Sequence, residues 1–385
     1  MIRLGFDAKR AFHNRTGLGN YARTFLQNLA HFYPENEYHV FSPALNSHAN
    51  RQHFDNPCFS TPFHFHPIPS PLASWRRSFQ MRGPLLSNRI QVYHGLSNEI
   101  PLDFNGLHGR VRSVLTVHDL IFLDLPSTYP WIDRRVYRFK TKRSLALADR
   151  VVAISEATRR QLLQHFPEHE HKIQVVLQPC SPEYYTDSPE SFPHPLAHQA
   201  YWLWVGTVEP RKNLEGVLHA LHLTHAEERL PLVVIGNTNH PYAQQCVQLA
   251  ASLGLKIHWN PHLHPDPGKL SDKKGNLIAW YHHAQGLLYP SHLEGFGLPV
   301  AEALLSRCPV ITTRHSSMAE ICGPYGLLVD ATQPEELQAA MASLRNDIGK
   351  AETLRQEGQR RAQSLLDPRR LTEQWMYLYR ELIGE

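Results

Sequence analysis

The sequence lacks a hydrophobic segment long enough to span a membrane. A membrane-spanning helix needs about 18 or more consecutive apolar residues, and here Asp, Arg, His or Pro interrupts every apolar run before that length. The first residues, Met1 to Asp7, also lack the basic, apolar and small-residue regions of an export signal, and they lead directly into a strand pattern. These absences predict a cytoplasmic protein that does not cross a membrane.

Cysteine is scarce and scattered. The 385 residues include five cysteines, and no two of them form a Cys-x-x-Cys pair. An odd number of separated thiols argues against a disulfide framework and against a zinc site. We therefore expect reduced thiols and no bound metal.

Neither charge nor apolarity is extreme, but the charge is unevenly distributed. With 42% hydrophobic and 19% charged residues the chain is typical of globular proteins, and its length predicts two domains. Residues 1–183 carry a formal charge of +8 and residues 184–385 carry −4. A basic half can attract nucleic acid, phosphorylated substrates or an anionic membrane. Because no nucleic-acid motif accompanies the charge, we expect no nucleic-acid partner.

Short apolar runs alternate with helical patterns along both halves, which predicts parallel, doubly wound sheets. The expected strands are 2–6, 38–42, 90–93, 113–118, 150–154 and 173–177 in the first half, and 201–206, 231–235, 286–289, 309–312 and 326–329 in the second. The expected helices are 19–31, 132–148, 155–165, 212–225, 241–252, 298–306, 334–345, 350–365 and 367–383. The predicted fold class is α/β, with two Rossmann-like domains in series.

The domain boundaries follow from proline content and from the end of the chain. Five prolines and no sustained periodicity in residues 178–199 predict a linker between the domains. Three aromatic residues on the last helix, Trp375, Tyr377 and Tyr379, need a surface to cover. The expected parts are an N-terminal domain (1–183), a linker (184–200), a C-terminal domain (201–365), and a terminal helix (366–385) that docks on the N-terminal domain.

One candidate site follows the expected strand 201–206. The run Val205-Gly206-Thr207-Val208-Glu209-Pro210-Arg211-Lys212-Asn213-Leu214 places a glycine turn after the strand and two cations at the entry to a helix. Arg211 and Lys212, together with the amides of a helix N-terminus, suit a pyrophosphate. The alternative is a solvated Arg-Lys pair at the start of a helix.

A second candidate site follows the expected strand 286–289. The run Glu294-Gly295-Phe296-Gly297-Leu298-Pro299 leads into a helix, with Glu302 one turn further on. Loop glycines let backbone amides approach a ligand closely, and ionised carboxylates accept hydrogen bonds from sugar hydroxyls. The alternatives are a favourable helix-terminal charge for Glu302 and a solvated loop position for Glu294.

Together these runs resemble the donor site of a known enzyme family. Glu-Pro-Arg-Lys-Asn after a strand, followed by Glu-Gly-Phe-Gly-Leu-Pro-x-x-Glu, is similar to the retaining GT-B glycosyltransferases of family 4 (group 1), and the resemblance covers nearly the whole chain. It implies that Arg211 and Lys212 hold the donor diphosphate, that Glu294 lies near the transferred sugar, and that Glu302 binds the donor ribose. The implied donor-binding residues are Gly206, Arg211, Lys212, Glu294, Gly295, Phe296, Gly297, Leu298 and Glu302. We expect the loss of Arg211 or Lys212 to reduce activity and to leave folding nearly unchanged.

The first half resembles the same family at three runs. Thr16-Gly17-Leu18-Gly19-Asn20-Tyr21 is similar to the family's glycine loop, and Thr116-Val117-His118-Asp119-Leu120 is similar to its histidine motif. Val152-Ala153-Ile154-Ser155-Glu156 is similar to the strand ahead of the cleft. The resemblance implies a catalytic His118 that faces the donor sugar, and an acceptor-side loop with Gly17, Gly19 and Asn20. Asn20 departs from the Arg or His often found there. A lone histidine at a strand end is otherwise more often structural, and Asp119 either orients its imidazole or caps the next segment.

Two other nucleotide-binding architectures are excluded. Gly17 to Ala22 fits the pattern Gly-x-Gly-x-x-Ala, but its first glycine lies ten residues past the strand that ends near Asp7, so we expect no nicotinamide cofactor. The sequence also contains no Asp-x-Asp, the metal–diphosphate signature of the other glycosyltransferase architecture. Cationic side chains and helix dipoles therefore neutralise the leaving nucleotide, with no metal and no tightly bound cofactor.

The resulting prediction is a retaining glycosyltransferase that moves a hexose from a nucleotide diphosphate sugar to a glycan or lipid-linked glycan, in the cleft between its domains. Resemblance to bacterial surface-polysaccharide mannosyltransferases favours GDP-mannose, with a UDP-sugar next. The resemblance implies a front-face displacement, with the acceptor bound by the first domain and the donor by the second. Because no residue is a convincing covalent nucleophile, we do not expect a double displacement. The alternatives are a nucleotide-sugar 2-epimerase on the same fold and a non-catalytic nucleotide- or glycan-binding relative.

Two segments of the basic half, residues 1–183, are rich in Lys or Arg. The first contains Trp75, Arg76, Arg77, Phe79 and Arg82, and the second contains Arg134, Arg135, Arg138, Lys140, Lys142 and Arg143 on the helix 132–148. Both fit peripheral contact with anionic lipid at the inner face of the membrane. The alternative is a solvated basic surface.

Overall fold

The computed structural model describes residues 1–14, 16–43, 63–68, 73–107, 109–186, 196, 199–260 and 271–385. Cys58 and most of the expected linker 184–200 lie outside these residues. The chain forms two units, one of Met1–Cys180 with Leu366–Glu385 and one of Ser181–Leu365. None of the helices in the described ranges has both the length and the apolar character that a bilayer span requires.

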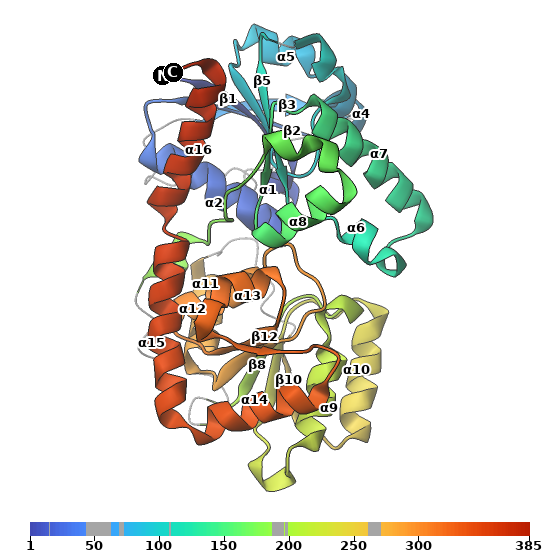
Figure 1. Ribbon diagram of the computed structural model, residues 1–385, viewed down its shortest axis with the longest axis vertical. Coiled ribbons are helices and arrows are strands. Elements are labelled where there is room, and N and C mark those ends of the chain that lie inside the picture. The colour runs from blue at the N-terminus through green and yellow to red at the C-terminus, as the bar shows by residue number, and fades with distance from the viewer. Residues whose placement is uncertain are drawn as a thin grey trace. The chain divides into compact units, whose positions relative to one another are not determined.

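The first unit is built on a seven-stranded parallel sheet with the order β3-β2-β1-β4-β5-β6-β7 (Figure 1). The strands are β1 (Arg3–Asp7), β2 (Glu37–Pro43), β3 (Phe63–Ile68), β4 (Val92–Gly95), β5 (Arg112–Val117), β6 (Arg150–Ala153) and β7 (Ile173–Val175). The sequence pattern predicted six of these strands. It missed β3, which lies at the edge of the sheet.

The helices of this unit lie between successive strands, except α16, which comes from the end of the chain. They are α1 (Lys9–His13), α2 (Gly17–Phe32), α4 (Ala73–Phe79), α5 (Arg82–Ser87), α6 (Ile121–Asp124), α7 (Trp131–Leu147), α8 (Glu156–His165) and α16 (Pro368–Ile383), with 3-10 turns at Leu102–Leu107, Pro126–Thr128 and Pro167–Lys172. Successive side chains of a strand point to opposite faces of the sheet. Accordingly Val114 of β5 belongs to one buried hydrophobic cluster and Leu115 to another, so both faces are covered.

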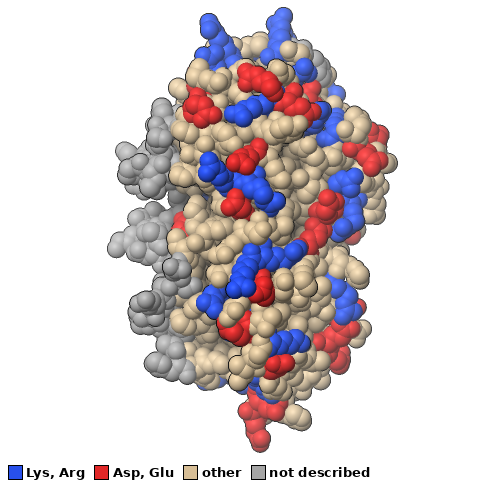
Figure 2. Space-filling view, turned by 60° about the vertical axis from the view of Figure 1, so that its left-hand side comes forward, with Lys and Arg blue, Asp and Glu red and all other residues tan. Residues whose placement is uncertain are grey.

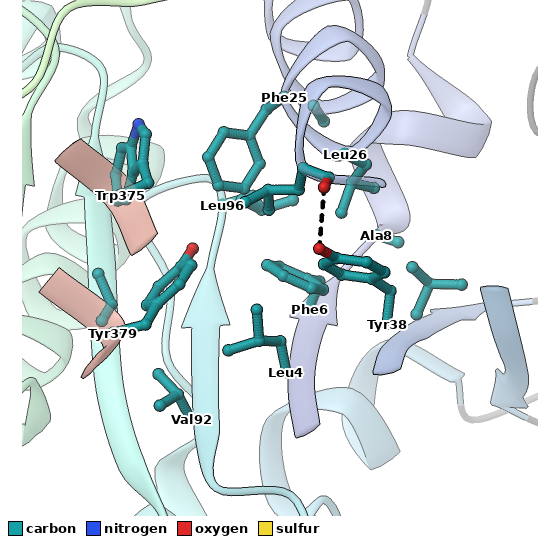
Figure 3. Close-up of a cluster of buried hydrophobic side chains, with 14 of the residues drawn as sticks. Leu4, Phe6, Ala8, Phe25, Leu26, Tyr38, Val92, Leu96, Trp375 and Tyr379 are labelled. Carbon is teal, nitrogen blue, oxygen red and sulfur yellow. Dashed lines mark hydrogen bonds between the residues drawn. The ribbon is translucent and has the colours of Figure 1, made fainter. Parts of the chain in front are cut away.

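Helix α16 brings the end of the chain onto the first unit. Trp375 and Tyr379 lie beside Phe25 and Leu96 in the core (Figure 3), and the ring centroids of Trp375 and Phe25 are 5.1 Å apart. The Tyr379 hydroxyl also makes a 2.7 Å hydrogen bond with His94 Nδ1. Tyr377 is 72% exposed. Because Tyr377 lies two residues from both Trp375 and Tyr379, it falls on the opposite side of the helix. Only two of the three aromatic residues therefore cover a surface.

The second unit is built on a six-stranded parallel sheet with the order β10-β9-β8-β11-β12-β13. The strands are β8 (Trp202–Val205), β9 (Leu232–Ile235), β10 (Ile257–Asn260), β11 (Gly286–Tyr289), β12 (Val310–Thr313) and β13 (Leu327–Val329). The helices are α9 (Leu214–Leu223), α10 (Pro241–Ser252), α11 (Ser271–His283), α12 (Leu298–Leu305), α13 (Ser317–Cys322), α14 (Pro334–Asn346) and α15 (Ile348–Leu365), with 3-10 turns at Pro182–Tyr185, Pro210–Lys212, Ala226–Glu228 and Gly323–Tyr325. The sequence pattern missed β10, again an edge strand.

Both units confirm the predicted α/β class with doubly wound parallel sheets. Each sheet reverses its order beside the first strand of its unit, since β1 lies between β2 and β4, and β8 lies between β9 and β11. In open α/β sheets, ligands bind beyond the carboxyl ends of the strands at this reversal. In the second unit, this rule points to the loops that follow β8 and β11.

Candidate functional site

The two candidate motifs of the second unit follow adjacent strands. Strands β8 and β11 are neighbours, with Trp202 paired to Gly286 and Leu203 to Leu287. Because parallel neighbours end at the same edge of a sheet, the loops that follow them start side by side. His292 N donates a 2.9 Å hydrogen bond to the carbonyl oxygen of Arg211. The sheet thus brings together two segments that lie far apart in the sequence.

The loop after β8 differs from the expected helix entry. Arg211 and Lys212 lie in a 3-10 turn, Pro210–Lys212, and α9 starts only at Leu214. The change occurs at Asn213, whose left-handed backbone (φ 53°) ends the turn. Its Oδ1 accepts a 3.1 Å hydrogen bond from Gly216 N and caps α9. The two cations are therefore held by a rigid turn ahead of the helix rather than by its first residues.

Three of the expected site residues form one ionic cluster. Arg211 Nη1 lies 2.8 Å from Glu294 Oε1, and Lys212 Nζ lies 4.0 Å from the same oxygen. Glu294 also accepts hydrogen bonds from the Tyr289 hydroxyl at 2.8 Å and from Ser291 Oγ at 3.2 Å. The Arg211, Lys212 and Glu294 side chains are only 13–14% exposed. We call these three residues the Arg211–Lys212–Glu294 cluster.

Burial and charge oppose each other in this cluster. Burial raises the pKa of Glu294, but Lys212 and Arg211 outweigh it and hold that pKa below its ordinary value. Burial lowers the pKa of Arg211, while the carboxylates of Glu294 and Glu209 raise it further than burial lowers it. Both groups therefore stay charged at neutral pH. Arg211 also donates to the Leu293 carbonyl oxygen, which fixes the direction of its guanidinium.

Gly206 is required by the close approach of Lys212. Its φ is +148°, and a Cβ added there would lie 2.8 Å from Lys212 Nζ. A side chain at this position would displace the lysine from the cluster. The glycine turn predicted from the sequence thus positions one of the two cations.

The second glycine loop leads into α12 as expected. Gly297 has a φ of +96°, and a Cβ added to it would lie 2.5 Å from Met318 Cγ. Phe296 is buried and Leu298 is the first residue of α12. Ser317 Oγ donates a 2.9 Å hydrogen bond to the carbonyl oxygen of Glu294, which ties this loop to α13. The loop that contains Gly295 is therefore held on both sides.

Glu302 lies in the second turn of α12. Its Oε2 accepts a 3.1 Å hydrogen bond from the hydroxyl of Tyr281, a residue of α11. The carboxylate is half-buried. Tyr281 therefore orients Glu302, and no sequence pattern marked this partner.

The expected acceptor-side loop in the first unit is helical. Gly17, Gly19 and Asn20 all lie in the first turn of α2, and Thr16 is its N-cap residue. A Cβ added to Gly19 would lie 1.8 Å from the carbonyl oxygen of Asn14. Asn20 Oδ1 accepts a 2.7 Å hydrogen bond from Arg23 Nη2. The glycine pattern is thus explained by close packing of the chain against a helix start, and the expectation of a loop was wrong.

His118 is buried at the end of β5. Its Nε2 donates a 2.8 Å hydrogen bond to the Leu96 carbonyl oxygen, and its ring stands edge-on to Tyr21 with centroids 4.6 Å apart. Burial lowers its pKa to about 4, despite the opposing effect of the hydrogen bond to Leu96. The ring is therefore neutral at pH 7, with the proton on Nε2 and the lone pair on Nδ1. Asp119 Oδ1 accepts from Ile121 N at 3.1 Å and so caps the next segment.

Several residues that hold the Arg211–Lys212–Glu294 cluster in place carried no predicted role. Glu209 Oε1 accepts a 2.6 Å hydrogen bond from Arg211 Nη2, and Ser291 Oγ donates to the Arg211 carbonyl oxygen at 3.1 Å. Tyr289 holds Glu294 from the end of β11. These polar residues lie at or shortly after the ends of buried strands, which is a usable signal, but the contact of Ser291 with Arg211 depends on β8 and β11 being neighbours.

The positive charges of this site are held in place by their neighbours. Two adjacent cations, partly shielded from water, lie at the carboxyl edge of the sheet. Ion pairs with carboxylates and hydrogen bonds to carbonyl oxygens fix their positions, rather than contacts with mobile water. Such preorganised charge is effective where negative charge develops on a leaving group.

Comparisons with known proteins agree with this geometry. A family model described as Glycosyl transferases group 1 matches residues 189–361, and one described as Glycosyltransferase Family 4 matches residues 15–183. O-antigen chain mannosyltransferase B of Escherichia coli is 29% identical over 66% of this chain and 66% of its own length. O-antigen chain mannosyltransferase RfbU of Salmonella typhimurium is 26% identical over 60% of this chain and 61% of its own length.

Among solved structures, Anabaena Alr3699/HepE in complex with UDP and glucose superposes with a TM-score of 0.72 at 15% identity, over 98% of this chain and 99% of the other. At this identity the likeness shows the fold alone. The matches to the two curated relatives span 66% and 61% of their lengths. The activities named for those proteins therefore support a proposal about this chain and do not establish its activity.

Proposed function

We propose that this chain, which belongs to the group 1 and family 4 glycosyltransferases, moves a hexose from a nucleotide diphosphate sugar to a glycan or lipid-linked glycan. The two doubly wound units have the GT-B fold. The observation that carries the proposal is the Arg211–Lys212–Glu294 cluster at the strand-order reversal of the second unit. We assign the donor to this unit and the acceptor to the first.

The proposed roles follow from charge and hydrogen-bonding capacity. Arg211 and Lys212 bind the diphosphate, and backbone amides of Gly295, Phe296, Gly297 and Leu298 approach the donor closely. Glu294 accepts from hydroxyls of the transferred sugar, and Glu302 accepts from the two ribose hydroxyls. The bound UDP of the Anabaena protein supports a nucleotide donor. Because both curated relatives are mannosyltransferases, we favour mannose and GDP-mannose over a UDP-sugar.

The proposed chemistry retains the configuration of the sugar. The bond from the sugar anomeric carbon to the β-phosphate oxygen breaks while the acceptor oxygen bonds to the same face, and the acceptor proton passes to the β-phosphate. Arg211 and Lys212 stabilise the charge that appears on the leaving diphosphate. Glu294 is already bonded to Arg211, Tyr289 and Ser291. A carboxylate so engaged is a weak nucleophile, which favours this front-face route over a covalent glycosyl-enzyme. His118, neutral and buried, would then present Nδ1 as an acceptor to the reacting sugar.

The test combines a binding panel with product analysis. Selective binding stabilises the native state by mass action, so GDP and GDP-mannose should raise the Tm more than UDP, UDP-glucose or UDP-N-acetylglucosamine. With an acceptor present, the product should carry the hexose in the donor's anomeric configuration. An epimerised free nucleotide sugar formed without acceptor would instead identify a 2-epimerase. Absence of both transfer and donor hydrolysis would leave a non-catalytic binding protein.

Transfer is expected to continue in the presence of EDTA. The reason is that Arg211 and Lys212, rather than a metal ion held by paired aspartates, meet the diphosphate charge. Initial rates with and without the chelator measure this. A complete loss that Mn²⁺ or Mg²⁺ restores would reject the electrostatic assignment, whereas partial stimulation by Mg²⁺ would be compatible with faster nucleotide release.

Glu302→Gln is expected to weaken nucleoside diphosphate affinity by about tenfold to a hundredfold, since a hydrogen bond to a charged group contributes about 1.5–3 kcal/mol. The loss should appear with the diphosphate alone because the proposed contact is to ribose. Titration calorimetry measures it, with Glu352→Gln on α15 as the matched control. Unchanged affinity in Glu302→Gln would disprove the ribose contact.

We also propose peripheral contact with anionic membrane, with a surface that differs from the expected one. Arg77 was expected to be a surface cation, but it is only 9% exposed and forms ion pairs with Asp7 and Glu99. It therefore belongs to the interior. The face shown in Figure 2 carries Lys and Arg interspersed with Asp and Glu and has no broad area of one sign.

Helix α7 is the better candidate for the membrane surface. Most residues in its first ten positions are exposed, including large apolar side chains that normally avoid water. Trp131 is 64% exposed and Phe139 is 63% exposed. Arg135 and Arg138, also exposed, accompany them. A helix with exposed apolar and cationic side chains suits the interface of an anionic bilayer.

Vesicle binding is expected to require anionic lipid and to fall steeply with salt. Each cation near such a surface contributes about 1 kcal/mol, and the attraction decays over about 10 Å at 0.1 M salt. Replacing Arg135 and Arg138 by Ser, or Trp131 and Phe139 by Ser, should weaken vesicle flotation without changing donor affinity. The matched control replaces the exposed Arg360 and Arg369 by Ser. Salt-insensitive binding, or equal losses in the control, would reject α7 as the contact.

A further inference from the structure

A cluster of potential metal ligands lies at the edge of the first sheet, apart from the proposed donor site. It involves Glu37 and His39 on β2 and His64 on the edge strand β3. His39 and His64 are register partners, and Glu37 precedes His39 by two residues, so all three side chains share one face of the sheet. One ligand atom from each lies within 4.8 Å of the other two.

His39 is held in an orientation that suits a metal ligand. Its Nδ1 lies 2.9 Å from His66 Nε2, and its Nε2 lies 3.5 Å from Glu37 Oε2. When Nδ1–H donates to His66, the lone pair of His39 remains on Nε2 and points toward Glu37. Metal-binding histidines commonly donate their second ring N–H to a partner in this way. His66 is then the outer partner that sets the tautomer.

The Glu37 carboxylate is held in place by a neighbouring basic side chain. Arg3 Nε lies 2.8 Å from Glu37 Oε2. Ligating carboxylates are themselves often hydrogen-bonded, so this contact is compatible with coordination.

We propose that Glu37, His39 and His64 bind a zinc-class divalent cation, with water as a fourth ligand. Two imidazoles and one carboxylate are a typical donor set for Zn²⁺, whereas Mg²⁺ and Ca²⁺ prefer oxygen ligands. Zn–N bonds of about 2.0–2.1 Å place tetrahedral ligand atoms about 3.3 Å apart. The ligand atoms of the three residues now lie up to 4.8 Å apart. Rotation of the exposed His64 side chain brings its ring nitrogen closer to the other two. His39, which is 5% exposed, stays in place.

The proposed ion would join the edge strand β3 to β2. Binding to ligands that only the folded sheet brings together adds the free energy of binding to stability. The site is independent of donor binding, so EDTA should remove this ion while transfer continues. The number and spacing of the cysteines predicted no bound metal. The Glu37, His39 and His64 cluster could not be predicted in that way because it forms only through the pairing of β2 with β3.

The test uses the chelator-treated full chain titrated with Co²⁺ and Zn²⁺. Tetrahedral Co²⁺ gives strong visible absorption bands. Zn²⁺ should displace one equivalent of bound Co²⁺ and should raise the Tm of the protein by at least about 2 °C. His64→Gln, a change at an exposed position, should lower Co²⁺ affinity at least tenfold, and Glu37→Gln should act in the same direction. His31→Gln, an exposed histidine on α2, is the matched control. Weak octahedral bands only, or equal affinity in wild type and His64→Gln, would overturn the proposal.

Discussion

Arg211→Ala lowers kcat/KM by about 10²–10³-fold in our expectation, equivalent to about 2.7–4 kcal/mol of lost transition-state stabilisation. The guanidinium that would neutralise the leaving diphosphate is absent in this variant, and Lys212 alone remains. Steady-state kinetics with the donor varied at fixed acceptor measures the effect. Arg211→Lys should recover only part of the activity, because an ammonium lacks the two-pronged geometry of a guanidinium.

The same substitution is also expected to lower the free energy of unfolding by about 3 kcal/mol, the cost of leaving one charge of a buried pair without its partner. This revises the expectation from the sequence that folding would be nearly unchanged. The Glu294 side chain is only 13% exposed and would keep a single cation, Lys212, at 4.0 Å. Chemical denaturation measures this loss.

A double-mutant cycle separates the two effects. Removing both Arg211 and Glu294 should restore part of the stability, since neither charge is then left buried without the other, but should not restore activity. Arg345→Ala, which breaks a more exposed ion pair with Glu228 in the same unit, is the control. Wild-type kcat/KM in Arg211→Ala would remove the basis of the diphosphate assignment.

Gly19→Ala is expected to destabilise the first unit by about 2–4 kcal/mol, through steric strain and the loss of hydrogen bonds at the start of α2. The new Cβ would lie 1.8 Å from the Asn14 carbonyl oxygen, which is backbone and cannot rotate away. Gly19 N also donates to the Thr16 carbonyl oxygen at 3.0 Å and to Asn14 Oδ1 at 3.2 Å. These contacts would break as the helix start shifts.

Denaturant unfolding and hydrogen exchange of α2 measure the effect of Gly19→Ala. The control is Gly83→Ala on α5, where a Cβ meets nothing within 4 Å. That change should be neutral or stabilising by up to about 1 kcal/mol, the gain in helix propensity. Equal stability of both variants would show that the chain around Asn14 relaxes without cost.

The sequence predicted every central strand and the edge strands β7 and β13, but it did not predict the edge strands β3 and β10. Strands buried on both faces, such as β8 and β9, are continuous apolar runs. The two missed strands, β3 and β10, lie at sheet edges. In β3 histidines and a proline interrupt the apolar residues. An edge strand can carry polar side chains because its outer surface meets water, so the apolar signal is lost.

The candidate site was predicted in part. The runs around Arg211 and Glu294 were recognisable from residue types and order, because glycine turns and charged residues after buried strands have a local signature. Their pairing was not recognisable. Glu294 meets Arg211 because β8 and β11 are neighbours, although β9 and β10 come between them in the sequence. The partner Tyr281 of Glu302 comes from α11, whereas Ser291 lies only three residues from Glu294 in the same loop.

The sequence by itself determined the α/β class, the central strands and the residue types available for binding. Only the tertiary structure decided that Gly19 serves close packing, that Arg77 is an interior ion-pair partner, and that His39 meets His64. The physical reason is the range of the interactions. Backbone periodicity and turn geometry are set by neighbours in the chain. Burial, ion pairing and ligand geometry depend on which strands pair and in which register, and many residues of the chain determine that choice together.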